Sequence, residues 1–179
     1  MDHQVEKYGF QKILKFLTSE ESTQLNKHFL TVRNESGVDD AVVEFTPERF
    51  FRQFPDISDR VVVLMSNQLG YRGLHPNKIW NVHTTSAVFD KKKLPFIPHF
   101  DNERYLKLIV YLNDVSETNG AFWASQYDVN SIETRRLELP EDYKKRKLNS
   151  FEGGHVFKPV VGNAGDAILF DTNCPHYAG

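Results

Sequence analysis

The second half of the chain is a succession of short apolar segments separated by turn-forming residues. Pairs such as Asn113-Asp114 and Asn119-Gly120 stand between segments rich in aliphatic and aromatic residues. This pattern predicts a β-sandwich or barrel, and the helix signals before it predict a helical layer packed on one side. We predict strands over residues 78–88, 96–101, 104–112, 121–127, 155–161 and 167–170.

Helix-start signals are concentrated in the first part of the chain. Thr18-Ser19-Glu20-Glu21 has the pattern of a capping box and predicts a helix from Ser19 to Val32. Thr46-Pro47-Glu48 starts a second helix, with proline in the first turn. The run from Ser58 to Leu69 predicts a third; its Val-Val-Val-Leu centre would also suit a strand, but its polar flanks favour helix. We further expect a short strand or a helical turn over residues 10–17 and a polar loop over residues 34–40.

Size and charge limit the possible functions. The chain has 179 residues and a net charge of −2, so one domain is expected and no nucleic-acid or membrane partner is implied. The single cysteine, Cys174, excludes an internal disulfide and a cysteine-based zinc cluster. The N-terminus lacks an apolar signal core, which predicts a cytoplasmic protein. We expect a single domain over 1–179, with a helical layer over 1–73, a β core over 74–179 and an insert over 131–150.

The insert is polar and carries charges of both signs. Its basic residues include Arg135, Arg136 and the run Lys144–Lys147, and four acidic residues offset them. Either it is a solvated loop with a helical turn, or it is a lid over a pocket, because long insertions in compact domains are often functional.

His99 and Asp101 are separated by one residue and lie at the end of the strand predicted over residues 96–101. In an extended chain they share a face, with Phe100 opposite. One more histidine would complete the 2-His-1-carboxylate site that suits non-haem Fe(II). Taken alone, the pair could equally be two solvated side chains at a strand end. Candidates for the further ligand are His83, His155 and His176.

Three other segments add context to this pair. Residues 163–176 combine a Gly165-Asp166 turn, an apolar strand and His176. Residues 9–21 suit an opening strand and first helix, and residues 112–123 contain Leu112-Asn113-Asp114 followed by Asn119-Gly120-Ala121. Together these segments resemble the phytanoyl-CoA dioxygenase family of Fe(II)/2-oxoglutarate oxygenases. The resemblance implies an α+β, mainly β fold: a double-stranded β-helix (jelly-roll, cupin-like) with N-terminal helices packed on one sheet.

The resemblance also implies a chemistry. His99, Asp101 and His176 would hold Fe(II), with His83 and His155 ranked below His176. The other requirements would be 2-oxoglutarate as cosubstrate and O2, with no catalytic residue beyond the metal ligands. The expected reaction oxidises an unactivated C–H bond of a small molecule, while 2-oxoglutarate becomes succinate and CO2.

The far carboxylate of 2-oxoglutarate needs a cation, because a buried unpaired carboxylate is costly. In the family an Arg on the strand after the distal His supplies it, whereas this sequence ends at Gly179. We expect either that the last strand and its Arg lie beyond the given sequence, or that the anchor has moved to Lys107. Lys107 would share a strand face with Tyr111, which joins it as a cosubstrate candidate together with Thr84 and Ser86. The alternative for Lys107 is an outward-facing side chain.

The substrate side differs from the family pattern. After Trp123 the chain has Ala124-Ser125-Gln126-Tyr127, where many members carry Pro-Gly-Ser-His. Trp80, Phe89 and Trp123 are predicted to line the pocket, although aromatic residues on strands also fill cores. Two other functions remain open at this point: a metal-binding cupin-like isomerase, and a non-catalytic binding module with the same fold.

Overall fold

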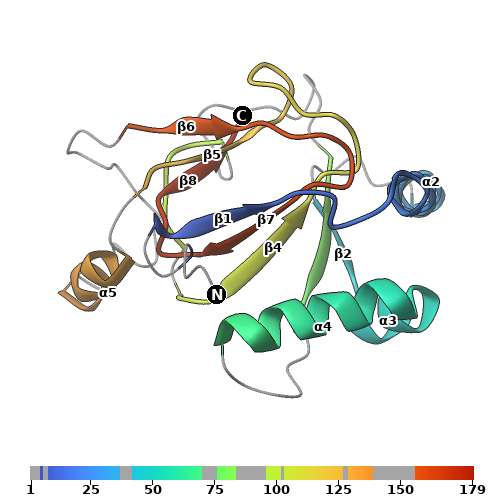
Figure 1. Ribbon diagram of the computed structural model, residues 1–179, viewed down its shortest axis with the longest axis horizontal. Helices are drawn as coiled ribbons and strands as arrows, with labels where there is room; N and C mark the ends of the chain where they lie inside the picture. The colour runs from blue at the N-terminus through green and yellow to red at the C-terminus, as the bar shows by residue number, and fades with distance from the viewer. Residues whose placement is uncertain are drawn as a thin grey trace. The chain divides into compact units, whose positions relative to one another are not determined.

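The computed structural model describes residues 5, 8–36, 42–69, 76–83, 96–101, 103–126, 129–138 and 156–179. The chain divides into two compact units, one formed by residues 1–23 and 90–179 and the other by residues 24–89 (Figure 1). The expected single domain, with its division into layers at residue 73, stays a prediction.

The first unit contains two antiparallel three-stranded sheets (Figure 1). In one sheet, β7 (Ala167–Asp171) lies between β1 (Phe10–Ile13) and β4 (Leu106–Val110). Every residue of β7 is buried, as expected for a central strand. In the other sheet, β5 (Phe122–Ala124) lies between β6 (Lys158–Val160) and β8 (His176–Ala178).

One core joins the two sheets of this unit. The rings of Phe122 on β5 and Phe170 on β7 lie 4.7 Å apart. The hydroxyl of Tyr111, just after β4, donates to the Val160 carbonyl at 2.7 Å and accepts from the Phe122 N–H at 3.1 Å. These bonds satisfy a buried polar group and tie β4 to both β5 and β6. The buried members of this core are Tyr111, Phe122, Ala124, Ile168, Phe170 and Cys174.

The turn before β7 is held by a carboxylate. Gly165 has φ +94°, and a Cβ there would collide with the Leu17 carbonyl, so glycine is required. The buried Asp166 accepts hydrogen bonds from the N–H groups of Lys15 (3.0 Å) and Asn163 (3.1 Å). Its Oδ2 also lies 3.1 Å from the Lys12 ammonium. The turn thus joins the start of β7 to the end of β1.

The second unit combines helices with a two-stranded sheet. It contains most of α2 (Ser19–Ser36), α3 (Pro47–Gln53) and α4 (Pro55–Leu69). The antiparallel strands β2 (Val42–Phe45) and β3 (Ile79–Val82) complete it. An aromatic cluster packs around the buried Phe29 and is formed by His28, Phe29, Phe45, Phe50 and Phe54.

The secondary structure corrects several predictions. The first predicted helix continues to Ser36, so residues 34–36 of the predicted loop are helical; residues 37–40 lie outside the described residues. The valine run is helical, and α4 begins at Pro55 rather than Ser58. Strand β2 was not predicted, because Val-Val-Glu-Phe is too short to be distinctive without its partner β3. Residues 96–101 form one isolated bridge at His99 instead of a strand.

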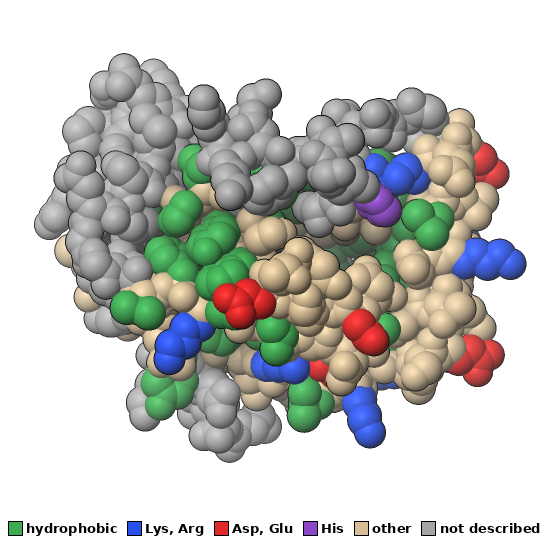
Figure 2. Space-filling model, turned by 90° about the horizontal axis from the view of Figure 1, so that it is seen from above, with side chains coloured by type: hydrophobic (Ala, Val, Ile, Leu, Met, Phe, Trp, Pro, Cys, Tyr) green, Lys and Arg blue, Asp and Glu red, His purple; other side chains and the backbone are tan. Residues whose placement is uncertain are grey.

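The predicted insert begins with a helix, α5 (Val129–Glu138). Ile132 is fully buried, so this part of the insert is packed rather than solvated. Residues 139–150 lie outside the described residues. None of the described helices combines the length and hydrophobicity needed to cross a bilayer. Figure 2 shows one face on which acidic and basic side chains are interspersed instead of forming a patch of one sign.

Candidate metal centre

Two segments far apart in sequence bring the three predicted ligands together. The N–H of His99 donates to the His176 carbonyl at 2.9 Å, and the N–H of His176 donates to the His99 carbonyl at 2.7 Å. The N–H of Asp101 donates to the Thr172 carbonyl at 3.0 Å. Backbone pairing therefore determines the positions of the ligands.

The ligand geometry suits a single small cation. One donor atom from each of His99, Asp101 and His176 lies within 4.8 Å of the others. The two imidazole centroids are 4.3 Å apart, and His99 Nε2 lies 3.7 Å from Asp101 Oδ1. Among the described residues, no fourth His, Cys, Asp or Glu joins the cluster. Two imidazoles and one carboxylate are the ligand set of non-haem Fe(II) sites with open positions.

Hydrogen bonds prepare both imidazoles to bind a metal. His99 Nδ1 lies 2.7 Å from the Ile97 carbonyl, and His176 Nδ1 lies 2.8 Å from the Cys174 carbonyl. A carbonyl oxygen can only accept, so each Nδ1 must carry the proton. In a neutral imidazole the remaining lone pair is then on Nε2. Backbone carbonyls commonly orient metal-binding histidines in this way, so the residues present fit a divalent metal.

Burial and charge favour the protonation states that a metal requires. Burial, reinforced by the neighbouring His99, lowers the pKa of His176 to about 3, so its imidazole is neutral at pH 7. Burial alone would raise the pKa of Asp101, but the Lys107 ammonium, 2.6 Å from Oδ2, outweighs burial, and the pKa is lowered. Neutral histidine and ionised aspartate are the ligating forms.

The loop between β7 and β8, here called the support loop, directly precedes the ligand His176. Its residues Thr172, Asn173, Cys174 and Pro175 are all fully buried. The Thr172 hydroxyl donates to the Glu103 carbonyl and accepts from the Tyr105 N–H, which connects the loop to the segment after Asp101. Burial raises the pKa of the Cys174 thiol to about 12, so this cysteine stays protonated. The loop acts as a rigid support.

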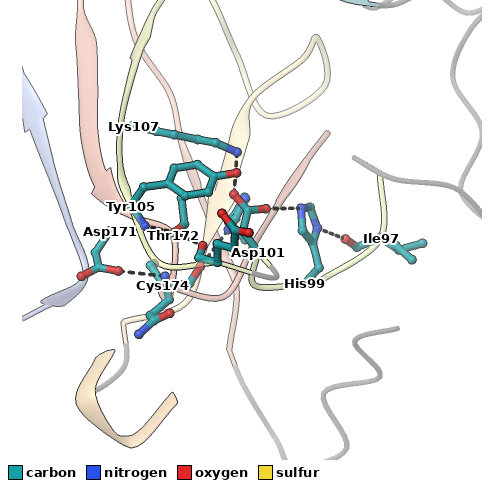
Figure 3. A network of polar contacts seen from close by, with 11 residues as sticks. Ile97, His99, Asp101, Tyr105, Lys107, Asp171, Thr172 and Cys174 are labelled. Carbon is teal, nitrogen blue, oxygen red and sulfur yellow. Dashed lines mark hydrogen bonds and ion pairs between the residues drawn. The ribbon is translucent and has the colours of Figure 1, made fainter. Parts of the chain in front are cut away.

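Lys107 points into this site. Figure 3 shows its ammonium and the His99 ring converging on Asp101. Nζ lies 2.6 Å from Asp101 Oδ2. On β4, Lys107 pairs with Phe170 of β7, and its Nζ lies 5.9 Å from the centroid of the Phe170 ring. The side chain therefore faces the core that the two sheets share, so the outward-facing alternative is excluded.

Comparison with known proteins agrees with this geometry. The family model for phytanoyl-CoA dioxygenase (PhyH) matches residues 9–179. The chain belongs to the phytanoyl-CoA dioxygenase family. Among curated protein sequences, comparison finds no significant match.

Solved structures with the same architecture confirm the predicted fold for this family member. The epimerase SnoN in complex with Fe3+, alpha-ketoglutarate and nogalamycin RO matches with TM-score 0.62 and 15% identity, over 98% of this chain and 74% of SnoN. HygX from Streptomyces hygroscopicus with nickel and 2-oxoglutarate gives 0.61 and 15%, over 96% and 75%. EvdO2 from Micromonospora carbonacea var. aurantiaca with 2-oxoglutarate gives 0.58 and 15%, over 98% and 81%.

The structure does not bring every predicted site residue to the ligands. Trp123 pairs in register with Tyr177 and stacks on it at 5.5 Å, whereas His176 pairs with Ala124. Because neighbouring strand residues face opposite sides, Trp123 lies on the other face of the sheet from His176. The Tyr111 hydroxyl is engaged by β5 and β6.

The remaining predicted residues lie elsewhere in the chain or outside the described part. Trp80 belongs to the second unit, where its Nε1 donates to Glu44 Oε2 at 3.1 Å. Predicted residues Thr84, Ser86 and Phe89, and the competing ligand His155, lie outside the described residues. The exposed His83 follows β3 in the second unit.

Sequence reasoning missed the residues that brace the support loop in this family member. Arg104 donates from Nε to Asp171 Oδ2 at 2.8 Å, and Asp171 Oδ1 accepts from the Asn173 N–H at 2.9 Å. The Asn173 side-chain amide donates to Glu133 on α5 at 2.9 Å. The available signal was the polar run Asp171-Thr172-Asn173 directly after an apolar strand, since buried polar groups need partners.

Proposed function

We propose that this protein is an Fe(II)- and 2-oxoglutarate-dependent dioxygenase that oxidises an unactivated C–H bond of a small molecule. The observation that carries the proposal is the set of three ligand atoms within 4.8 Å, with both histidine Nδ1 atoms hydrogen-bonded to backbone carbonyls. Membership of the phytanoyl-CoA dioxygenase family supports it. The likeness to structures that contain Fe3+ or nickel with 2-oxoglutarate supports the choice of metal and cosubstrate.

The chain's own residues would bind and orient the reactants. His99 and His176 offer Nε2 lone pairs, and Asp101 supplies the negative charge that compensates a divalent cation. Phe170 and Phe122 lie 4.9 Å and 5.5 Å from the His176 ring, so aromatic side chains shield this ligand from water. With iron bound, the site would couple decarboxylation of 2-oxoglutarate by O2, which yields succinate and CO2, to transfer of one oxygen atom to the substrate.

Anaerobic titration of the Fe(II)-loaded protein with 2-oxoglutarate tests the proposal. We expect a weak visible charge-transfer band in the wild type and none in His99→Ala or His176→Ala. His83→Ala is the matched control, because His83 is an exposed histidine that competed for the ligand role. It should keep the band. Succinate release under air would then establish turnover of the cosubstrate.

Two results would contradict the proposal. Failure of the wild type to bind Fe(II), Mn(II) or Co(II) would favour a non-catalytic binding module. Metal binding without any charge-transfer band or succinate would favour a cupin-like isomerase that uses the metal without 2-oxoglutarate. Where turnover is found, mass analysis of substrate candidates distinguishes hydroxylation, which adds one oxygen, from an oxidation that ends in epimerisation.

A further inference from the structure

The two oxygens of the Asp101 carboxylate have different partners. Oδ2 lies 2.6 Å from the ammonium of Lys107, while Oδ1 lies 3.7 Å from His99 Nε2. Oδ1 is therefore the oxygen on the imidazole side, and Oδ2 is engaged by a cation of the protein itself. A carboxylate can bind a metal through one oxygen or through both. The Lys107 contact favours binding through one.

Packing holds the Lys107 ammonium in this position. The residue lies on β4, and the pairing of β4 with β7 sets its place opposite Phe170. Nζ lies 5.2 Å from the Tyr105 ring centroid and 5.9 Å from that of Phe170, distances at which aromatic rings attract a cation. Only 24% of the Lys107 side chain is exposed. The ammonium is therefore a fixed charge beside the ligand.

We propose that Lys107 is a positioning residue that holds Asp101 as a one-oxygen metal ligand and lowers the affinity of the site for divalent cations. The inference rests on the proposed function, since it assumes a cation between His99, Asp101 and His176. A free Oδ2 could also coordinate that cation and would fill a position that a reactant needs. The ammonium prevents this and repels the cation at short range.

This role differs from the one predicted from sequence, in which Lys107 anchors the far carboxylate of 2-oxoglutarate. A lysine that only anchored 2-oxoglutarate, away from Asp101, would affect binding of 2-oxoglutarate and leave metal affinity nearly unchanged when 2-oxoglutarate is absent. A positioning residue on Asp101 changes metal affinity in the absence of any cosubstrate. The two roles therefore make different predictions for metal affinity measured without 2-oxoglutarate.

The test is anaerobic calorimetric titration of the full chain with Mn(II) and Co(II), without 2-oxoglutarate. We expect Lys107→Met to bind each metal about tenfold more tightly than the wild type, because a like charge has been removed from a part-buried site. Lys107→Arg keeps the charge and should stay within about threefold of the wild type. Lys12→Met removes the similar ion pair with Asp166, where the lysine side chain is 31% exposed, and should leave metal affinity unchanged.

The outcomes separate this inference from the proposed function. If the wild type binds neither metal, the proposed function fails. If the wild type binds metal but Lys107→Met binds it equally or more weakly, only this inference is overturned. That result, accompanied by weaker 2-oxoglutarate binding, would instead assign Lys107 to the cosubstrate. Thermal unfolding of the metal-free variants shows whether any change in affinity is separate from a loss of folded protein.

Discussion

The two ends of β7 each have a lysine–aspartate pair, and the two pairs serve different purposes. At the start of the strand, Lys12 contacts Asp166 at 3.1 Å. Near its end, Lys107 contacts Asp101 at 2.6 Å. Both lysines lie on strands that flank β7, and both are partly exposed, at 31% and 24% of the side chain.

What surrounds each carboxylate accounts for the difference. Asp166 also accepts two backbone N–H bonds, so its acceptor capacity is used in holding the Gly165-Asp166 turn. Asp101 faces two imidazoles whose Nδ1 protons are directed away to backbone carbonyls. Backbone donors make a carboxylate structural, whereas lone pairs around it create a place for a cation.

The largest effect that we expect is on metal binding at Asp101, near the end of β7. Asp101→Ala removes the anionic ligand and should weaken Mn(II) or Co(II) binding at least about a hundredfold, more than loss of an outer-shell partner. The metal-free protein should lose only a little stability, because Lys107 is partly exposed and can be rehydrated when its partner is removed. Calorimetry and thermal unfolding measure the two effects. Affinity within threefold of the wild type would contradict the ligand assignment.

At the start of β7 we expect a change in stability without a change in metal affinity. Asp166→Ala leaves the N–H groups of Lys15 and Asn163 and the Lys12 ammonium without this acceptor. We expect a loss of about 3 kcal/mol in the free energy of unfolding, with unchanged metal affinity of the folded protein. Urea denaturation measures the loss. Asp59→Ala, at an exposed position on α4, is the control and should stay within about 0.5 kcal/mol of the wild type.

Lowering the pH should distinguish the effect of His176 on stability from the effects of the two carboxylates. The pKa of His176 is lowered to about 3, so between pH 6.5 and 3 the unfolded chain takes up a proton that the folded chain does not. Stability of the metal-free protein should therefore fall as pH falls, by on the order of 2 kcal/mol from pH 6.5 to 4.5. The pKa values of Asp101 and Asp166 are lowered, so their contributions are lost only below about pH 4.

Urea denaturation in the presence of a chelator at several pH values checks this prediction. Burial also lowers the pKa of His28 in the second unit, which adds a slope of the same sign. The decisive comparison is therefore the wild type against His176→Gln, in which the slope between pH 6.5 and 4.5 should be smaller. An identical slope in both proteins would contradict the assignment to His176.

The smallest effect concerns the helix that braces the support loop. Glu133→Ala removes the acceptor for the Asn173 amide, and we expect a loss of about 1 kcal/mol in the free energy of unfolding. Metal affinity should fall only about threefold, as expected for a mild disturbance outside the ligand shell. Glu133→Gln keeps an acceptor oxygen and should lie closer to the wild type. The neighbouring exposed Thr134→Ala is the control on the same helix.

Sequence periodicity was sufficient for some features and insufficient for others. Alternation on the strand after His99 and Asp101 placed Lys107 on the same face as Tyr111, and both do face the shared core. The contact of Lys107 with Asp101 could not be predicted, because it depends on how the segment before β4 folds back. The second helix start at Pro47 was also clear from local signals.

Features that depend on partner strands were beyond sequence reasoning. Trp123 was predicted to line the pocket, but its face is set by the register of β5 against β8, which local sequence does not determine. Strand β2 is likewise defined by its pairing with β3. The partners of Asp171 and Asn173 come from Arg104 and Glu133, which are distant in sequence.

The burial of the loop from Thr172 to Pro175 has a consequence for metal exchange. A segment with so little contact with solvent cannot open unless the surrounding core opens too, so its amide protons should exchange with deuterium only through global unfolding. The conformational entropy of the ligand residues is therefore lost when the chain folds, and not when the cation binds. Repeated loss and recovery of the cation would leave the backbone unchanged, and the rate of recovery would depend on how fast the ion sheds its own water.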